Sequence, residues 1–270
     1  MNIIKLLQCI FLGAVQGFTE PIPISSSGHL LIIRKILGFN LFNDINFEII
    51  VNFGSFIAIC ILYRKQILKL ISDFFNYIKT KNNDYKSNFN YCILIIIGTI
   101  PAGIGGLLFK SKIDEISNNV KLVGIALIIT ALALYLIKDF KGTKGKDEIT
   151  KTDSLIIGIY QMIALLPGIS RSGSTIVGAM SRSLDRKMAV DYSFMLYLPI
   201  SLASMILGVK DIISSTISSN LMVLYIIGAL VSLVVTFFSA KWFINVIKKG
   251  KLGYFALYCL IVGILVTLFL

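Results

Sequence analysis

The chain has 270 residues, of which 56% are hydrophobic and only 15% are charged, and its mean hydropathy is +0.84. Long apolar runs of this kind exclude a soluble domain and predict an integral membrane protein. The net charge of +12 does not indicate nucleic-acid binding, because the basic residues lie in short segments between apolar runs, as in the positive-inside pattern. The four cysteines fall inside apolar segments without paired spacing, which favours packing roles over disulfides or metal ligands.

Residues 16–29, QGFTEPIPISSSGH, are the first departure from plain apolar helix. They combine a carboxylate, two prolines, three serines and the single histidine of the chain between the apolar runs Leu6–Val15 and Leu30–Phe39. Because proline lacks a backbone N–H, we expect the helix to break around Pro21–Pro23. Each run is shorter than the roughly 20 residues that span a bilayer, so the pair is predicted to form a re-entrant hairpin sheltered by protein or a water-filled cavity.

Six longer apolar runs are predicted to span the membrane. They are Phe47–Tyr63, Tyr91–Phe109, Val120–Ile137, Tyr192–Val209, Leu221–Phe243 and Tyr254–Leu270. Residues 64–90 carry several Lys and Arg residues and are expected to form a loop, and the polar residues 138–154 mark the midpoint of the chain. The expected fold is therefore all-α, a single polytopic membrane domain with six transmembrane helices and two re-entrant helical hairpins.

The second half of the chain repeats the first at a shift of 145 residues. The aligned identities are Gly13, Gln16, Ile24, Ser25, Ser27 and Gly28 with Gly158, Gln161, Ile169, Ser170, Ser172 and Gly173. The similarity continues more weakly in FEIIVNFGSFIA (47–58) against YSFMLYLPISLA (192–203). Self-similarity at a fixed spacing indicates an internal repeat, so a second hairpin is expected around PGISRSGST.

Three spanning helices in each repeat require the two halves to enter the membrane with opposite orientation, as in the inverted repeats of many transporters. The repeats cover about 1–137 and 155–270, joined by 138–154. Segments 64–90, 138–154, 182–187 and 241–251 hold 18 of the 26 Lys and Arg residues. This asymmetry predicts that these segments are cytoplasmic, that both termini are external and that the hairpin tips meet inside the membrane.

The tips bring together residue types that suit a phosphate. They are Glu20, Ser25, Ser26, Ser27 and His29 from the first tip, and Ser170, Arg171, Ser172, Gly173, Ser174 and Thr175 from the second. A guanidinium binds phosphate oxygens in pairs, and hydroxyls and glycine-rich backbone amides complete the shell. Glutamate repels a bare phosphate, so Glu20 suggests a bridging divalent cation, Mg²⁺ or Ca²⁺.

Other polar residues are expected to support this site. Gln16 lies one helical turn before Glu20 and is a candidate neutral metal ligand. Glu48 and Asn52 share a helix face and are expected to support the site from behind, as is the repeat partner Gln161.

Structural alternatives remain open for the central residues. Glu20 and Arg171 could form a plain ion pair, the serines could satisfy the broken backbone, and Thr175 could cap the next helix.

QGFTEPIPISSSGH and LLPGISRSGST resemble the two signature motifs of the undecaprenyl-diphosphate phosphatases of the bacitracin-resistance type. The resemblance covers essentially the whole chain in order, spacing, length and repeat. It implies a bacterial plasma-membrane enzyme that removes the terminal phosphate of undecaprenyl diphosphate and returns the carrier lipid to cell-wall synthesis, with a homodimer as a further expectation. The first family motif has Glu or Gln, three residues, then Glu; here Gln16 takes the first place, which keeps an oxygen and removes a charge.

Three function classes follow: a lipid-diphosphate phosphatase, a transporter or flippase of a polyprenyl phosphate lipid without or in addition to phosphatase activity, and a phosphatase of the soluble-acid-phosphatase-like kind. The third needs a further histidine that the chain lacks. Two phosphatase mechanisms fit the residues. Ser26 attacks the phosphorus with His29 as general base, or His29 activates water while the serines bind phosphate. In both, Glu20 holds the cation and Arg171 stabilises the transferring group.

Overall fold

A computed structural model of the chain describes residues 3–39, 45–117, 119–214 and 217–270, and these are almost entirely helical, with no strand among them. Six helices are long and apolar enough to cross a membrane. They are α3 (Ile45–Thr80), α4 (Lys86–Leu108), α6 (Val120–Ile137), α9 (Arg186–Ser214), α10 (Ser219–Lys248) and α11 (Leu252–Phe269). The predicted all-α membrane fold with six spanning helices is confirmed.

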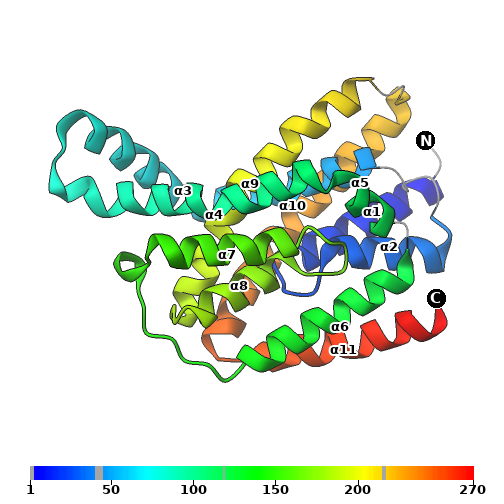
Figure 1. Cartoon of the computed structure of the whole chain (residues 1–270). Helices are drawn as coiled ribbons and strands as arrows, with labels where there is room; N and C mark the ends of the chain where they lie inside the picture. Colours follow the sequence, from blue (N-terminus) through cyan, green and yellow to red (C-terminus); the bar gives the residue numbers. More distant parts are fainter. Residues whose placement is uncertain (1–2, 40–44, 118, 215–216) are drawn as a thin grey trace.

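Two pairs of shorter helices flank the predicted breaks. The first pair is α1 (Ile3–Thr19) and α2 (Ser26–Leu37), and the second is α7 (Lys151–Ile163) and α8 (Arg171–Ser181). The turn between α1 and α2 lies in the interior of the bundle, away from the end that carries both termini (Figure 1). The two helix breaks therefore occur at the predicted Pro- and Gly-containing segments. That each helix pair enters the membrane and returns to the same surface, the two pairs from opposite surfaces, stays a prediction.

The loop predicted over residues 64–90 is wrong. α3 continues unbroken to Thr80, and after a short turn α4 begins at Lys86. The two helices form an antiparallel pair that projects beyond the rest of the bundle (Figure 1). Phe89 stacks on Phe74 with ring centroids 5.2 Å apart and packs on Tyr77 at 4.6 Å. The basic residues therefore lie on the outside of a helical hairpin whose inner face is aromatic. A further short helix, α5 (Lys110–Ser117), was not predicted.

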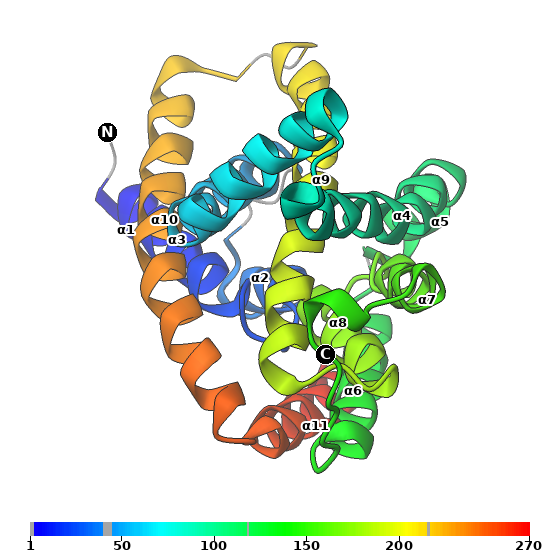
Figure 2. The same ribbon diagram turned by 90° about the vertical axis from the view of Figure 1, so that its left-hand side faces the viewer.

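Helices that correspond under the 145-residue shift pack in corresponding ways. α1 lies along α10 and α7 lies along α4, on opposite sides of α2, α8 and α9 (Figure 2). Gly13 faces the backbone of Gly228, and Gly158 faces that of Gly98. In each pair a Cβ would overlap a carbonyl oxygen of the other helix, so glycine permits the close approach. Gly13 and Gly158 align under the 145-residue shift, whereas their partners Gly228 and Gly98 do not.

The buried Asp153 holds together the open ends of the second hairpin. Its carboxylate accepts hydrogen bonds from Lys144 Nζ at 2.9 Å and from Arg182 Nε at 2.8 Å, and it closes a capping box with Thr150 at the start of α7. Burial raises the pKa of Asp153, but these hydrogen bonds outweigh burial and hold the pKa below its ordinary value. This cluster ties α7 to the end of α8 and so positions Arg171 at the other end of α8.

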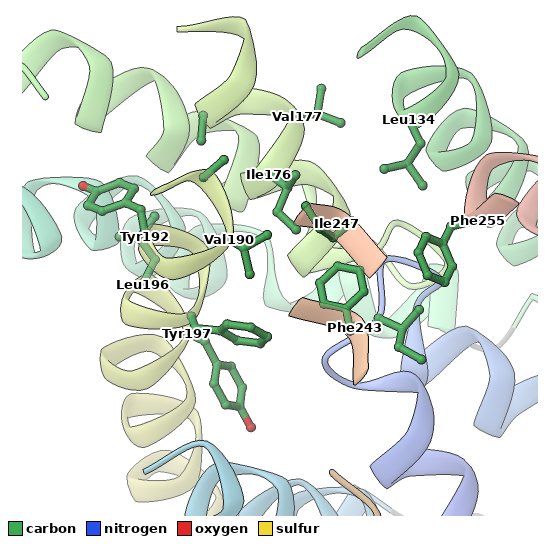
Figure 3. Packing of buried hydrophobic residues seen from close by; sticks show 14 of the residues in the cluster. Leu134, Ile176, Val177, Val190, Tyr192, Leu196, Tyr197, Phe243, Ile247 and Phe255 are labelled. Carbon is green, nitrogen blue, oxygen red and sulfur yellow. The ribbon is translucent and has the colours of Figure 1, made fainter. Parts of the chain in front are cut away.

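α8 packs on a hydrophobic core. Ile176 and Val177 of α8 belong to one buried cluster with Leu134 of α6 and with Phe243 and Ile247 of α10 (Figure 3). Branched and aromatic side chains packed at interior density leave α8 few alternative positions. The start of α8 is therefore held rigidly within the bundle.

Membrane orientation can be tested with two exposed lysines at opposite ends of the molecule. In a variant without the native cysteines, Lys79→Cys at the α3–α4 tip should not react with an impermeant maleimide in intact cells, because the basic end is predicted to be cytoplasmic. It should react after lysis. Lys5→Cys near the N-terminus is the control and should react in intact cells. The reverse pattern would invert the orientation.

Candidate active site

A cavity of about 310 Å³ lies where the two helix breaks meet. Its walls come from the end of α1, both breaks, and the starts of α2, α3 and α8, together with α9. The residues that line it are Gln16, Glu20, Ser25, Ser26, Ser27, Glu48, Ile49, Asn52, Ala164, Leu165, Ile169, Arg171, Ile200, Ser201 and Ser204. The contributing part of α3 is its start, near the end with both termini, and that of α9 is its middle (Figure 1), so the cavity lies between the middle of the bundle and that end.

Glu20 bonds to polar residues from both helix breaks. One oxygen forms an ion pair with Arg171 Nη2. The other accepts hydrogen bonds from Ser26 Oγ and, at 2.9 Å, from Gln16 Nε2. The Glu20 side chain is 6% exposed, and a carboxylate buried to this extent is stable only when paired and hydrogen-bonded. The structure thus brings together four polar residues expected in the site, from two segments about half the chain apart.

Tyr197 holds Arg171 from the opposite side. The guanidinium carbon lies 4.0 Å from the centroid of the Tyr197 ring, within the range of a cation–π interaction. The tyrosine hydroxyl donates to Asn52 Oδ1 at 3.1 Å. In Figure 3 this side chain projects from α9 with its hydroxyl directed away from the hydrophobic cluster. The sequence interpretation missed Tyr197, although a signal was present, because the 145-residue shift aligns Asn52 with Tyr197.

Two helices begin at the cavity, each with the same serine cap. Ser25 Oγ accepts from the amide of Gly28 at 3.4 Å, and Ser170 Oγ accepts from the amide of Gly173 at 3.1 Å. Ser25 and Gly28 align with Ser170 and Gly173 under the 145-residue shift. The free amides and positive dipole end of a helix start attract anions. Ser25 also has a φ of 68°, a strained value for a residue other than glycine that is typical of functional sites.

Several expected phosphate ligands have other roles in the structure. Ser172 Oγ donates to the carbonyl of Ile22 at 3.1 Å and so joins the two breaks. Thr175 is buried within α8, where its hydroxyl bonds the carbonyl of Arg171 at 2.9 Å and the hydroxyl of Ser193 at 2.5 Å. Ser174 donates its amide to the carbonyl of Ser170 in the first turn of α8. None of these residues, nor Gly173, is among the lining residues of the cavity.

His29 does not meet Ser26 in this structure. Its Nδ1 lies 2.8 Å from the carbonyl oxygen of Ser25, and its Nε2 lies 2.8 Å from the hydroxyl of Tyr258 on α11. The two rings are stacked at 5.5 Å. Both ring nitrogens therefore have partners other than Ser26, and the expected Ser26–His29 pair is not formed. A spacing of three residues would let the two side chains share a helix face, but Ser26 is bonded to Glu20 and His29 to Tyr258 of α11 instead.

The expected supporting residues divide into two groups. Glu48 and Asn52 line the cavity, as their shared helix face predicts. Glu48 also pairs with the buried Arg34, a residue that the sequence interpretation did not single out. Gln161 lies elsewhere: its Nε2 donates to the carbonyl of Gly98 at 3.4 Å, where α7 packs on α4. It supports helix packing rather than the cavity.

The cavity contains the types of oxygen donor that a hard cation binds. Glu20 and Glu48 supply carboxylates, and Gln16 and Asn52 supply amide oxygens, which are the ligands that Mg²⁺ and Ca²⁺ prefer. No cluster of three or more His, Cys, Asp and Glu residues occurs in the described part of the chain. A cation held here would therefore complete its shell with neutral amide and water oxygens and with the anionic oxygens of a bound phosphate.

Residues 9–265 match the family described as bacitracin resistance protein BacA. The chain is 43% identical over 265 residues to undecaprenyl-diphosphatase 2 of Bacillus thuringiensis (strain Al Hakam), which covers 98% of each chain. It is 43% identical over 270 residues to undecaprenyl-diphosphatase 1 of Bacillus licheniformis, over the full length of both. It is 39% identical to the undecaprenyl-diphosphatase of Oceanobacillus iheyensis, over 100% of this chain and 98% of the relative.

Proposed function

The chain belongs to the bacitracin resistance protein BacA family, and we propose that the cavity around Glu20 is the site at which it hydrolyses a lipid diphosphate. The protein is an undecaprenyl-diphosphatase, which converts undecaprenyl diphosphate to undecaprenyl phosphate and inorganic phosphate. One observation carries the proposed location. Glu20 joins Ser26 of the first break to Arg171 of the second inside one cavity. Transport in place of hydrolysis is not favoured, because the relatives are named as diphosphatases.

Charge complementarity supports this location. The terminal phosphate of the substrate is anionic, and the cavity presents Arg171 and the starts of α2 and α8. Arg171 is 24% exposed, so a phosphate can reach its guanidinium and share it with Glu20. Tyr197 keeps the guanidinium plane in place during this exchange. A divalent cation bound by Glu20 and Glu48, with the amide oxygen of Gln16, would neutralise phosphate charge.

The hydrogen bond between Ser26 and Glu20 suggests how the nucleophile is activated. Ser26 Oγ attacks the terminal phosphorus while Glu20 accepts its proton, and the bond from phosphorus to the bridging oxygen breaks. Undecaprenyl phosphate leaves, and water then hydrolyses the phosphoserine to release inorganic phosphate. In this proposal Glu20 takes the role of base that the sequence interpretation gave to His29, since His29 is bonded to Tyr258 instead. Arg171 stabilises the charge of the transferring group.

Location in the membrane follows from the predicted orientation. The cavity lies toward the end with both termini, which the basic residues predict to be external. The apolar tail of the substrate would stay in the bilayer while its diphosphate enters the cavity. The proposed site is therefore at the external side of the bacterial plasma membrane.

Release of inorganic phosphate by the purified protein in detergent tests the function directly. Undecaprenyl diphosphate should yield phosphate in the presence of Mg²⁺ or Ca²⁺, whereas a transporter alone yields none. EDTA should abolish the activity, and either cation should restore it. Activity that survives EDTA unchanged would contradict the role of the cation but not the phosphatase function. No phosphate under any condition would contradict the function itself.

Replacement of Ser26 tests the nucleophile. Ser26→Ala should lower kcat by about 10⁴-fold, as expected when a covalent nucleophile is deleted. His29→Gln should lower it far less, because the ring of His29 does not touch Ser26. A tenfold loss for Ser26→Ala together with an inactive His29→Ala would instead favour water activated by the histidine.

Arg171→Lys keeps the positive charge but removes the planar pair of donors and weakens stacking on Tyr197. We expect kcat to fall by about 10²-fold, comparable to the loss of one dedicated oxyanion donor. Arg64→Lys, at an exposed position of α3 outside the cavity, is the matched control and should retain near wild-type activity. Arg171→Lys within about threefold of wild type would show that charge alone is required.

A further inference from the structure

A second cavity, separate from the site around Glu20, lies between α6 and α11. This groove has a volume of about 700 Å³ and shares no lining residue with the first cavity. It is at the end of the two helices that is opposite the C-terminus (Figure 1). Apolar residues of both helices form its walls, and among them Leu132 is 55% and Leu257 57% exposed. The two side chains are available to an apolar molecule from the bilayer.

One end of the groove carries two lysines, each over a tyrosine ring. Lys138 Nζ lies 3.7 Å from the centroid of Tyr135, and Lys251 Nζ lies 5.6 Å from that of Tyr254. Cation–π contacts of this kind hold the ammonium groups near the groove. Asp139 also lines this end, but it is 88% exposed and 3.9 Å from Lys138. Such an exposed pair is weak, so this end of the groove stays cationic.

A third cation supports the same end. Arg186, at the start of α9, donates from Nη2 to the carbonyl of Lys138 at 3.0 Å. Its guanidinium packs against Gly250, which lines the groove with a φ of +72°. Arg186 Nε is buried and has no hydrogen-bond partner, and no carboxylate in the described ranges pairs with this residue. Because no carboxylate neutralises the guanidinium beside Gly250, its charge adds to that of the two lysines at this end of the groove.

We propose that this groove binds an anionic phospholipid. An acyl chain lies along the apolar walls between α6 and α11, and the phosphate lies at Lys138, Lys251 and Arg186. Tyr135 and Tyr254 then occupy the level of the membrane interface that tyrosines favour. Basic pockets between transmembrane helices bind acidic head groups through the same combination of charge and apolar surface. The volume of the groove suits one chain of a lipid.

Charge argues against a second copy of the chain as the occupant. In a two-fold dimer through this groove, the same patch of each subunit would face the other. The lysines and Arg186 of one subunit would then approach those of its partner, and like charges brought together destabilise an interface. A phosphate supplies the opposite charge.

Native mass spectrometry of the purified protein in detergent tests this proposal. A larger fraction of the protein should retain added 1-palmitoyl-2-oleoylphosphatidylglycerol than retains the phosphatidylcholine with the same acyl chains. The double variant Lys138→Gln/Lys251→Gln should bind phosphatidylglycerol about 30-fold more weakly, since each lysine near an anionic head group contributes on the order of 1 kcal/mol and about 1.4 kcal/mol corresponds to tenfold. Phosphatidylcholine binding should not change. Lys65→Gln/Lys69→Gln removes two exposed lysines from α3 and should leave the preference for phosphatidylglycerol intact.

Folding of each variant is checked by its Tm in detergent and by phosphate release, since neither lysine belongs to the cavity around Glu20. Equal retention of phosphatidylglycerol by wild type and by Lys138→Gln/Lys251→Gln would overturn the proposal. A changed ratio of monomer to dimer with unchanged lipid binding would also overturn it and would assign the groove to a subunit contact. If the double variant misfolds, Leu257→Trp, which narrows the exposed wall, should weaken phosphatidylglycerol binding, and undiminished binding would reject the site.

Discussion

The ion pair between Glu20 and Arg171 is the interaction on which the arrangement of the two helix breaks depends. It is formed inside a membrane protein, where a single unpaired charge is costly. Each residue stands at the tip of one hairpin, so neither tip can move away without leaving a buried charge behind. Ser26 and Gln16 satisfy the remaining oxygen of Glu20, and Tyr197 covers the free face of the guanidinium.

The same constraint explains why the breaks contain serines and glycines. A helix that starts inside the bundle leaves its first amide groups without intrahelical partners. Ser25 and Ser170 each satisfy one amide of their hairpin, and the positive dipole ends of α2 and α8 favour an anion beside them. Residues that stabilise the interrupted backbone thus also create a phosphate site. The structural and functional interpretations of these serines do not exclude each other.

Two surfaces of the molecule are suited to phosphate, but they differ in character. The cavity around Glu20 is interior and contains carboxylates, which fits the proposed hydrolysis of a phosphate held together with a cation. The groove between α6 and α11 opens to the bilayer and combines cations with exposed apolar walls, which suits a lipid that is bound but not converted. The aromatic α3–α4 tip adds a helical extension at the basic end of the molecule.

The sequence alone determined the membrane class, the six spanning helices and both breaks, because apolar run length, proline and glycine act locally. The meeting of Glu20 and Ser26 with Arg171 was predicted from the inverted repeat, which places the two breaks opposite each other. It did not determine the α3–α4 extension, since charged residues on one side of an amphipathic helix look like a loop when only composition is considered. Which way a side chain leaves its helix was decided by tertiary packing. His29 turned to Tyr258 and Tyr197 to Arg171 because their partners lie on helices distant in sequence.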